Sequence, residues 1–186
     1  MFDRLYAEKS DPWNLASSPY EQEKYAATIA ALGGRRFARG LEAGCSIGIL
    51  TRRLARHCET LLAVDASEAP LILARQHCAD LPAVRFERLR IPDQWPGGCC
   101  FDFVVFSEVL YFLNRADILR TVRRTLASLA PRGVVLLVNW TGPTNSPSTG
   151  DAAAEVFIAA TERHLVPRLR RRGPLWRLDL LAQGGE

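Results

Sequence analysis

The stretch Glu42-Ala43-Gly44-Cys45-Ser46-Ile47-Gly48 decides the fold of this chain. It follows a short apolar run at 37–41 and precedes Ile49-Leu50-Thr51-Arg52-Arg53-Leu54, whose apolar residues have helical spacing. This order predicts a strand over about 37–43, a tight glycine turn, and a helix over about 48–57. Glycine turns of this kind let the backbone approach a ligand closely, and three classes of site use them.

Two of the three classes fit poorly. The stretch Gly44-Cys45-Ser46-Ile47-Gly48 spells G-x-S-x-G, the nucleophile elbow of α/β-hydrolases, which needs an acid and then a histidine downstream. His164 is the one candidate histidine, but only one strand is predicted before Ser46 and no second glycine-rich loop offers an oxyanion hole. A nicotinamide or flavin site needs G-x-G-x-x-G, and Ser46 and Ile49 stand at its second and third glycine positions.

Downstream, apolar runs alternate with helical patterns. Further strands are predicted at 61–64, 84–89, 101–106 and 134–138. Helices are predicted to begin after Ser67 and Asn114, and Pro131-Arg132-Gly133 is predicted to be a tight turn. The order of a helix, four strand–helix units and a fifth strand predicts a parallel, doubly wound sheet.

Both ends of the chain add elements to this core. The first helix is predicted to begin at Pro19, with Ser18 and Glu21 forming a capping box. At the other end a helix is predicted over 151–163. Strands at 166–171 and 176–182 are predicted to form an antiparallel hairpin that closes the sheet.

Three more features favour the third class of site. Asp65 ends the second strand twenty-one residues after Gly44, where a carboxylate accepts hydrogen bonds from ribose hydroxyls. The stretch from Phe101 to Leu113 and the sequence Leu129-Ala130-Pro131-Arg132-Gly133-Val134 follow in order. Together these segments resemble class I methyltransferases that use S-adenosylmethionine (SAM).

Other stretches between about residues 10 and 140 are similar to the NodS-type family. They are Asp11-Pro12-Trp13, Ser18-Pro19-Tyr20-Glu21, Lys24-Tyr25, Glu42-Ala43-Gly44-Cys45 and Ser107-Glu108-Val109-Leu110-Tyr111. The resemblance implies an α/β, Rossmann-like, doubly wound seven-stranded sheet, mostly parallel, with an antiparallel C-terminal hairpin and helices on both faces. It implies one domain with a lid over 1–35, a SAM-binding core over 36–140 and an acceptor side over 141–186.

The resemblance also implies a cofactor site for SAM and its product S-adenosylhomocysteine (SAH). The residues expected to contact the cofactor are Trp13, Tyr20, Glu42, Gly44, Cys45, Ser46, Gly48, Asp65, Ala66, Arg90, Ile91 and Ser107. Trp13 and Tyr20 would form a lid, and Asp65 would bind the ribose. Glu42 would support the methionine ammonium, and the Ser107 carbonyl would meet it as well.

Two positions depart from the family pattern. Ser46 replaces the usual middle glycine, which is acceptable if its φ is negative, and its hydroxyl could reach the SAM carboxylate. Arg90 stands where many relatives carry an aspartate that accepts a hydrogen bond from adenine, and an arginine cannot accept one. Ile91 or a backbone carbonyl is therefore expected to contact the ring.

The resemblance implies a methyl acceptor, most plausibly an amine of an amino sugar, because NodS-type enzymes N-methylate deacetylated chitooligosaccharides. Glu108 is the first candidate for the base or ammonium binder, with Tyr111 beside it. Asp151 is the second, although it equally suits a helix N-cap. The alternatives are O-methylation of a small natural product, favoured by an apolar pocket of Trp140, Phe157 and Trp176, and a non-catalytic SAM-binding or partner-binding domain.

Composition limits the remaining possibilities. The chain has 186 residues, 48% of them hydrophobic, with no apolar run near the roughly 20 residues that span a bilayer and no visible secretory signal. We expect a cytoplasmic protein with a small-molecule or saccharide acceptor and no membrane partner. Oligomeric state is left open.

Charge and cysteine content favour neither a nucleic-acid partner nor a metal site. The net charge is +4, and the run Arg168-Leu169-Arg170-Arg171-Arg172 is expected to be a solvated strand face or edge, with contact to an acidic or phosphorylated substrate as the alternative. The five cysteines are odd in number and contain no C-x-x-C pair, which disfavours a disulfide framework or zinc. The adjacent pair Cys99-Cys100 suits a redox switch or, more simply, half-buried thiols.

Overall fold

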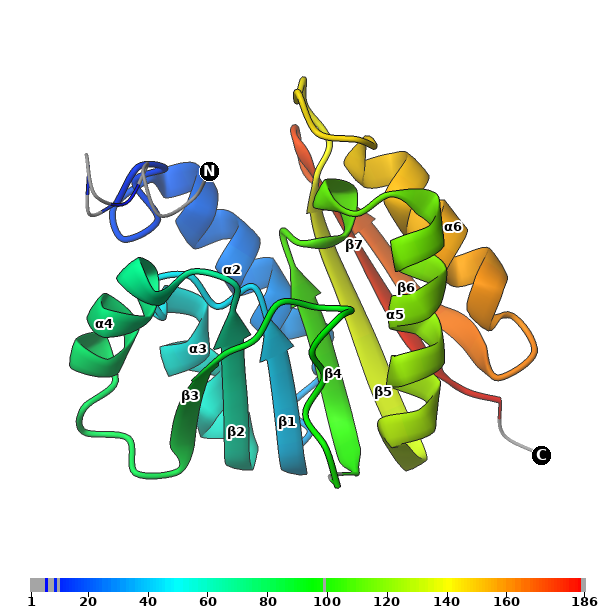
Figure 1. The fold of residues 1–186 in the computed structure, drawn as a ribbon, viewed down its shortest axis with the longest axis horizontal. Coiled ribbons are helices and arrows are strands. Elements are labelled where there is room, and N and C mark those ends of the chain that lie inside the picture. Colours follow the sequence, from blue (N-terminus) through cyan, green and yellow to red (C-terminus); the bar gives the residue numbers. More distant parts are fainter. Residues whose placement is uncertain (1–5, 7–8, 10, 99, 185–186) are drawn as a thin grey trace. The chain divides into compact units, whose positions relative to one another are not determined.

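A computed structural model describes residues 6, 9, 11–98 and 100–184. It contains a seven-stranded sheet in the order β3-β2-β1-β4-β5-β7-β6 (Figure 1). The strands are β1 (Phe37–Ala43), β2 (Cys58–Asp65), β3 (Val84–Arg88), β4 (Phe101–Ser107), β5 (Leu129–Trp140), β6 (Leu165–Arg172) and β7 (Trp176–Gln183). The predicted fold class is confirmed, and every predicted strand is present. The chain divides into two compact units, Met1–Arg90 and Ile91–Glu186.

The first unit contains three parallel strands and their helices. β1 pairs with β2 and β2 with β3, both in parallel, so that Ala43 lies opposite Val64 and Asp65 opposite Arg88. Its helices are α2 (Pro19–Ala31), α3 (Ile49–Leu54), the short 3-10 helix η1 (Ala55–His57) and α4 (Glu68–His77). Helices α3 and α4 pack on β2 and on each other. The predicted helix over 48–57 is thus an α-helix whose last turn tightens into η1.

The capping box predicted for α2 does not form. Ser18 occupies the N-cap position before Pro19, but its side chain makes no capping hydrogen bond. The Glu21 carboxylate instead accepts a hydrogen bond from Lys24 Nζ at 3.0 Å, and both side chains are buried. Because both side chains of this pair are buried, the Glu21 carboxylate and the Lys24 ammonium compensate each other's charge along the helix.

The second unit is built on β4 and β5, which pair in parallel, and on the antiparallel ladders of β7 with β5 and with β6. Nearly all of β4 and of β5 from Val134 onward is buried, as expected for strands covered on both faces. Its helices are η2 (Leu110–Phe112), α5 (Arg115–Ser128) and α6 (Gly150–Thr161), and α6 packs on α5, β5, β6 and β7. As predicted, Asn114 caps α5, because its Oδ1 accepts the Asp117 amide at 2.9 Å.

The described residues of 89–100 form turns and bends, as expected from Pro92 and the Pro96-Gly97-Gly98 cluster, which mark a loop, so the count of four strand–helix units was one too high. One local prediction was wrong. Pro131-Arg132-Gly133 is not a turn before β5 but an irregularity within it. The register steps from Phe101↔Leu129 to Phe103↔Val134, and Arg132 takes a left-handed φ of 63° in the extra segment.

Among the described residues, no helix is both long and apolar enough to span a membrane. Cys99 lies outside the described residues, so the predicted Cys99-Cys100 pair has no structural account. Cys100 is an exposed free thiol, whereas Cys45, Cys58 and Cys78 are buried.

Candidate functional site

In the glycine turn after β1, every second residue has a left-handed φ. Gly44, Ser46 and Gly48 have φ values of 85°, 48° and 83°. The expectation that Ser46 takes a negative φ was therefore wrong, because the turn needs a left-handed residue at this position whichever side chain occupies it. A non-glycine residue in this region is strained by about 1–2 kcal/mol, and such strain is concentrated at functional sites.

The turn is held against the end of β2 and against α4. The amides of Gly44 and Cys45 both donate to the Val64 carbonyl, at 2.9 and 3.1 Å. Gly48 lies so close to α4 that a Cβ there would stand 3.0 Å from the Ala74 Cα. The Cys45 side chain packs into a core cluster with Ala63 and Leu71, so only the backbone of Cys45 faces the turn.

Asp65 anchors this turn through its carboxylate. Its Oδ2 accepts the Ser46 amide and its Oδ1 accepts the Ser67 amide, each at 3.0 Å. The carboxylate is half-buried at the end of β2 and is an acceptor-only group, the type of group that binds hydroxyls. Ala66, the next residue, is exposed, and its carbonyl accepts from Arg88 Nε at 3.3 Å.

Tyr6 contacts the turn and was missed by sequence reasoning. Its hydroxyl shares a short hydrogen bond with Ser46 Oγ, and its ring meets Trp13 edge to face at 5.5 Å between centroids. Burial raises the pKa of Tyr6 well above its usual range, so the phenol stays neutral. Trp13 itself is 44% exposed. No local motif in the sequence marks Tyr6.

Two other predicted cofactor residues belong to this unit. Tyr20 is half-buried in the first turn of α2, with the Lys24 ammonium over its ring at 5.2 Å. Arg90 is exposed at the last position of the unit.

Glu42 is fully buried two residues before Gly44, and neither carboxylate oxygen has a hydrogen-bond partner. Burial, with a smaller contribution from the Asp65 charge, raises the pKa of Glu42 to about 7. A buried carboxyl without a partner is rare and calls for an explanation.

In the second unit, Glu108 lies directly after β4 with a left-handed φ of 58°. Its amide donates to the Val138 carbonyl at 2.9 Å, and its Oε2 accepts the Trp140 amide at 2.7 Å. The half-buried carboxylate is thereby fixed against the end of β5. Ser107, just before it, is buried.

Tyr111 is in the same unit but is mostly enclosed. It is 7% exposed, its ring lies 4.5 Å from that of Phe112, and its carbonyl accepts the Ser148 amide at 3.3 Å. This last bond ties η2 to the loop before α6. Ile91 is half-buried at the start of the unit.

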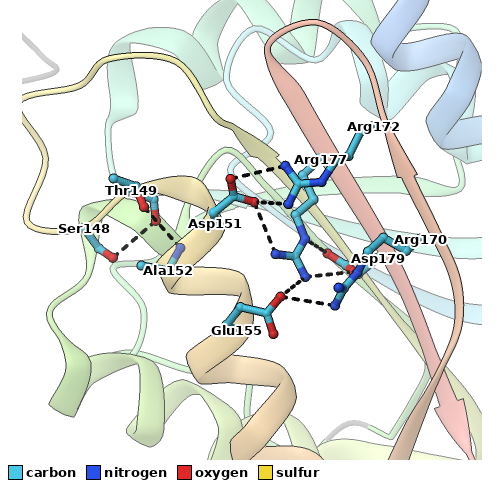
Figure 2. Close-up of polar contacts among 9 residues, drawn as sticks. All are labelled: Ser148, Thr149, Asp151, Ala152, Glu155, Arg170, Arg172, Arg177 and Asp179. Atoms are coloured by element: carbon cyan, nitrogen blue, oxygen red, sulfur yellow. Dashed lines mark hydrogen bonds and ion pairs between the residues drawn. The ribbon is translucent and has the colours of Figure 1, made fainter.

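Asp151 is not the N-cap of α6. Thr149 is, because its side chain accepts the Ala152 amide at 3.1 Å (Figure 2). Asp151 binds arginines instead: Arg172 at 2.6 Å and Arg177 at 3.2 Å. The hydrogen bonds from these guanidinium groups hold the pKa of Asp151 below its usual range, so the carboxylate is a poor base.

The same cluster contains a buried ion pair that sequence reasoning missed. Arg177 is 1% exposed and donates from Nε to Asp179, which is 0% exposed, at 2.6 Å. Glu155 binds both Arg177 and Arg170, and Arg170 also binds Asp179 (Figure 2). Two patterns mark these groups in the sequence: Arg177-x-Asp179 shares one face of a strand, and Asp151 and Glu155 are four apart on a helix.

The arginine run of β6 is thus an edge strand whose Arg170 and Arg172 bind carboxylates of α6 and β7. The apolar pocket considered for the O-methylation alternative does not form as expected. Phe157 is fully buried against Phe106, and Trp176 is 4% exposed, so both belong to the core. Among the described residues, no group of histidine, cysteine or acidic side chains is arranged to hold a metal ion.

Three features of the first unit, all within the described residues, fit the binding of SAM. The first unit combines a turn built on left-handed residues, the half-buried carboxylate of Asp65, and the orphaned carboxyl of Glu42. Both acidic groups suit a ligand that carries hydroxyls and positive charge.

Comparisons with solved structures agree with this fold. The N-methyltransferase NodS from Bradyrhizobium japonicum WM9, solved in complex with SAH, superposes with a TM-score of 0.84, 20% identity and coverage of 98% of this chain and 96% of that one. A putative methyltransferase from Pseudomonas syringae is 34% identical, with a TM-score of 0.75, over 88% of this chain and 99% of that one. The strand order with its antiparallel hairpin is that of class I SAM-dependent methyltransferases.

Sequence comparisons identify the family. The family model for Nodulation protein S (NodS) matches residues 4–165. Nodulation protein S from Sinorhizobium fredii is 30% identical over 167 residues, covering 88% of this chain and 77% of the relative. The Rhizobium tropici protein of that name is 32% identical over 125 residues, covering 66% of this chain and 52% of the relative. The chain belongs to the NodS family of SAM-dependent methyltransferases.

Proposed function

We propose that this protein transfers the methyl group of SAM to an amine, most plausibly on an amino sugar. The observation that carries the proposal is the turn of the first unit, in which the Asp65 carboxylate anchors the strained Ser46. Support for N-methylation comes from family membership and from the NodS of Bradyrhizobium japonicum, which is named an N-methyltransferase.

On the cofactor side, the residues of the first unit have separate roles. The turn from Gly44 through Ser46 to Gly48 receives the methionine part, and Asp65 accepts hydrogen bonds from the ribose hydroxyls. Glu42 supports the ammonium. Ala66 flanks the adenine with its exposed side chain. Tyr6 and Trp13 hold the N-terminal segment at the turn.

The remaining predicted cofactor residues keep their proposed roles. Tyr20 contributes to the lid, Arg90 and Ile91 flank the adenine, and the buried Ser107 offers its carbonyl to the methionine amine. Cys45 contributes through its backbone, because its side chain belongs to the core.

SAM supplies an activated methyl group, so the protein has to orient the acceptor and take up a proton. Glu108 takes that role, because it is a half-buried carboxylate that the Trp140 amide holds at the end of β5. An amine is protonated at neutral pH and attacks only after it loses that proton. Tyr111 stiffens the η2 segment that follows Glu108.

Asp151 is not included among the catalytic groups. Two guanidinium groups hold it in the ionised form, and a carboxylate with a lowered pKa is a weaker proton acceptor. Its proposed role is structural, in holding the start of α6 against the hairpin.

A polar acceptor is favoured over a small aromatic one by the burial of Phe157 and Trp176 in the core. The test is a SAM-dependent assay on a panel of partially deacetylated chitooligosaccharides, glucosamine, phenols and small carboxylic acids. We expect transfer to the amino sugars, identified as N-methylation by mass spectrometry.

Methylation of phenols or acids alone would replace this proposal with O-methylation. SAH binding without transfer to any acceptor would indicate a non-catalytic SAM-binding domain. In the expected case, the Glu108→Gln variant should retain SAH binding and lose most of the transfer.

A further inference from the structure

The buried carboxyl of Glu42 has no ion-pair partner in the described part of the chain. The arginines of α3 are engaged elsewhere, Arg52 with Asp80 and Arg53 with Gln22, and Arg39 on β1 is exposed. His77, which ends α4, binds the Ile47 carbonyl at 2.7 Å. The carboxyl therefore lies in the protein interior without the compensation that buried charges normally have.

The groups that act on Glu42 make its ionisation less favourable. From β2, the Asp65 charge repels a second negative charge. The thiols of Cys45 in the turn and Cys78 after α4 have raised pKa values, so near neutral pH they are uncharged and give Glu42 no compensating charge. Thr51 on α3 is the exception, a hydroxyl that favours the ionised form, although its Oγ1 also has no hydrogen-bond partner.

We propose that Glu42 is largely a neutral carboxylic acid in the ligand-free protein near neutral pH and ionises when the cofactor's ammonium arrives, so that cofactor binding releases a proton. This inference rests on the proposed function, because it requires SAM or SAH to bind at the turn that follows Glu42. The O–H bond of the carboxyl breaks, its proton leaves to the buffer, and the carboxylate is then balanced by the ammonium charge.

The pH dependence has a definite sign. Burial raises the pKa of Glu42 to about 7 in the free protein, and a bound cation lowers it. Cofactor affinity should then rise with pH and level off above about pH 7. Below that pH it should fall by up to about tenfold per pH unit, because each binding event must first remove one proton.

The experiment is titration calorimetry with SAH at about pH 6.5 in two buffers of different ionisation enthalpy, which counts the protons released. We expect the wild type to release more than half a proton and the Glu42→Gln variant to release almost none. Glu59→Gln, an exposed acid on β2, is the matched control and should behave as the wild type. The variant comparison subtracts any proton that comes from SAH itself or from the histidines.

The possible failures are distinguishable. If SAH binds but the wild type and Glu42→Gln release equal numbers of protons, the inference is wrong and the proposed function stands. If SAH does not bind to the folded wild type at any pH, the proposed function itself fails. Should Glu42→Gln not fold, infrared difference spectra of the wild type replace it. Loss of a protonated carboxyl C=O band on SAH binding supports the inference, and an unchanged band overturns it.

Discussion

The Ser46 amide donates a hydrogen bond to Asp65 Oδ2 over 3.0 Å, so the turn after β1 and the end of β2 hold each other in place. Ser46 is strained at a φ of 48°, and the bond to Asp65 is one of the contacts that maintain this conformation. Asp65, the proposed ribose acceptor, and the turn proposed to bind the methionine part thus depend on each other for their positions. A substitution in either of them should therefore change the position of both.

Replacing Asp65 should weaken SAH binding strongly. Asp65→Ala removes a charged acceptor from the ligand and from the amides of Ser46 and Ser67, and hydrogen bonds to charged groups contribute about 1.5–3 kcal/mol each. We expect affinity to fall at least tenfold in titration calorimetry. The control is Asp80→Asn, an exposed acid paired with Arg52. Equal affinities for Asp65→Ala and the wild type would rule out the ribose assignment.

Substitutions at Ser46 should separate backbone strain from the contact with Tyr6. Ser46→Ala keeps the strain and loses the hydroxyl, whereas Ser46→Gly relieves the strain as well. We expect Ser46→Gly to be about 1 kcal/mol more stable than Ser46→Ala in urea unfolding. The same difference should persist in a Tyr6→Phe background. If glycine is no better than alanine, the turn is not strained at this position.

Replacing Glu108 should affect transfer more than binding. Glu108→Gln keeps an oxygen to accept the Trp140 amide but removes the proton acceptor. General base catalysis contributes about 10²–10⁴ in rate, so turnover should fall by at least a hundredfold while SAH affinity changes little. Glu162→Gln, an exposed acid after α6, is the control. Normal turnover in Glu108→Gln would remove this residue as the base.

The buried pair of Arg177 and Asp179 should be essential for stability. Arg177→Met leaves Asp179 without its buried partner, and breaking a buried pair costs about 3–5 kcal/mol. Denaturant unfolding should show this loss, whereas Arg171→Met on the exposed part of the same hairpin should change stability little. Similar unfolding midpoints for the two variants would mean that Arg170, which also binds Asp179, compensates for the loss of Arg177.

Asp151 should make stability depend on pH in the acid range. Its pKa is lowered in the folded protein, so its contribution is present above the unfolded value of about 3.9 and is lost as the pH falls through the folded value. The gap in unfolding free energy between the wild type and Asp151→Asn should therefore be wider at neutral pH than at about pH 3. Glu162→Gln should show no such change, and a gap independent of pH would contradict the assignment.

The fold was predictable because its signals are local and repeated. Apolar runs such as Val134–Val138 mark buried parallel strands, and the glycines at 44 and 48 mark the turn. The count of strand–helix units was one too high, because Pro92 and Pro96 make the segment after β3 a loop. The capping box at Ser18 did not form: the Ser18 side chain makes no capping bond, and Glu21 pairs with the buried Lys24 one turn along the helix.

By itself, the sequence determined the fold class, the family and the candidate residues at the strand ends, since each depends on residue types at fixed spacing. Only the tertiary structure decided how those residues are used. It turned Ser46 left-handed against Asp65 and brought Tyr6 to it across forty residues. It also paired the ionised carboxylate of Asp151 with arginines of the C-terminal hairpin, and it left the Glu42 carboxyl buried without a hydrogen-bond partner. Burial and long-range pairing set the charge state of a side chain, and neither can be read from its neighbours in sequence.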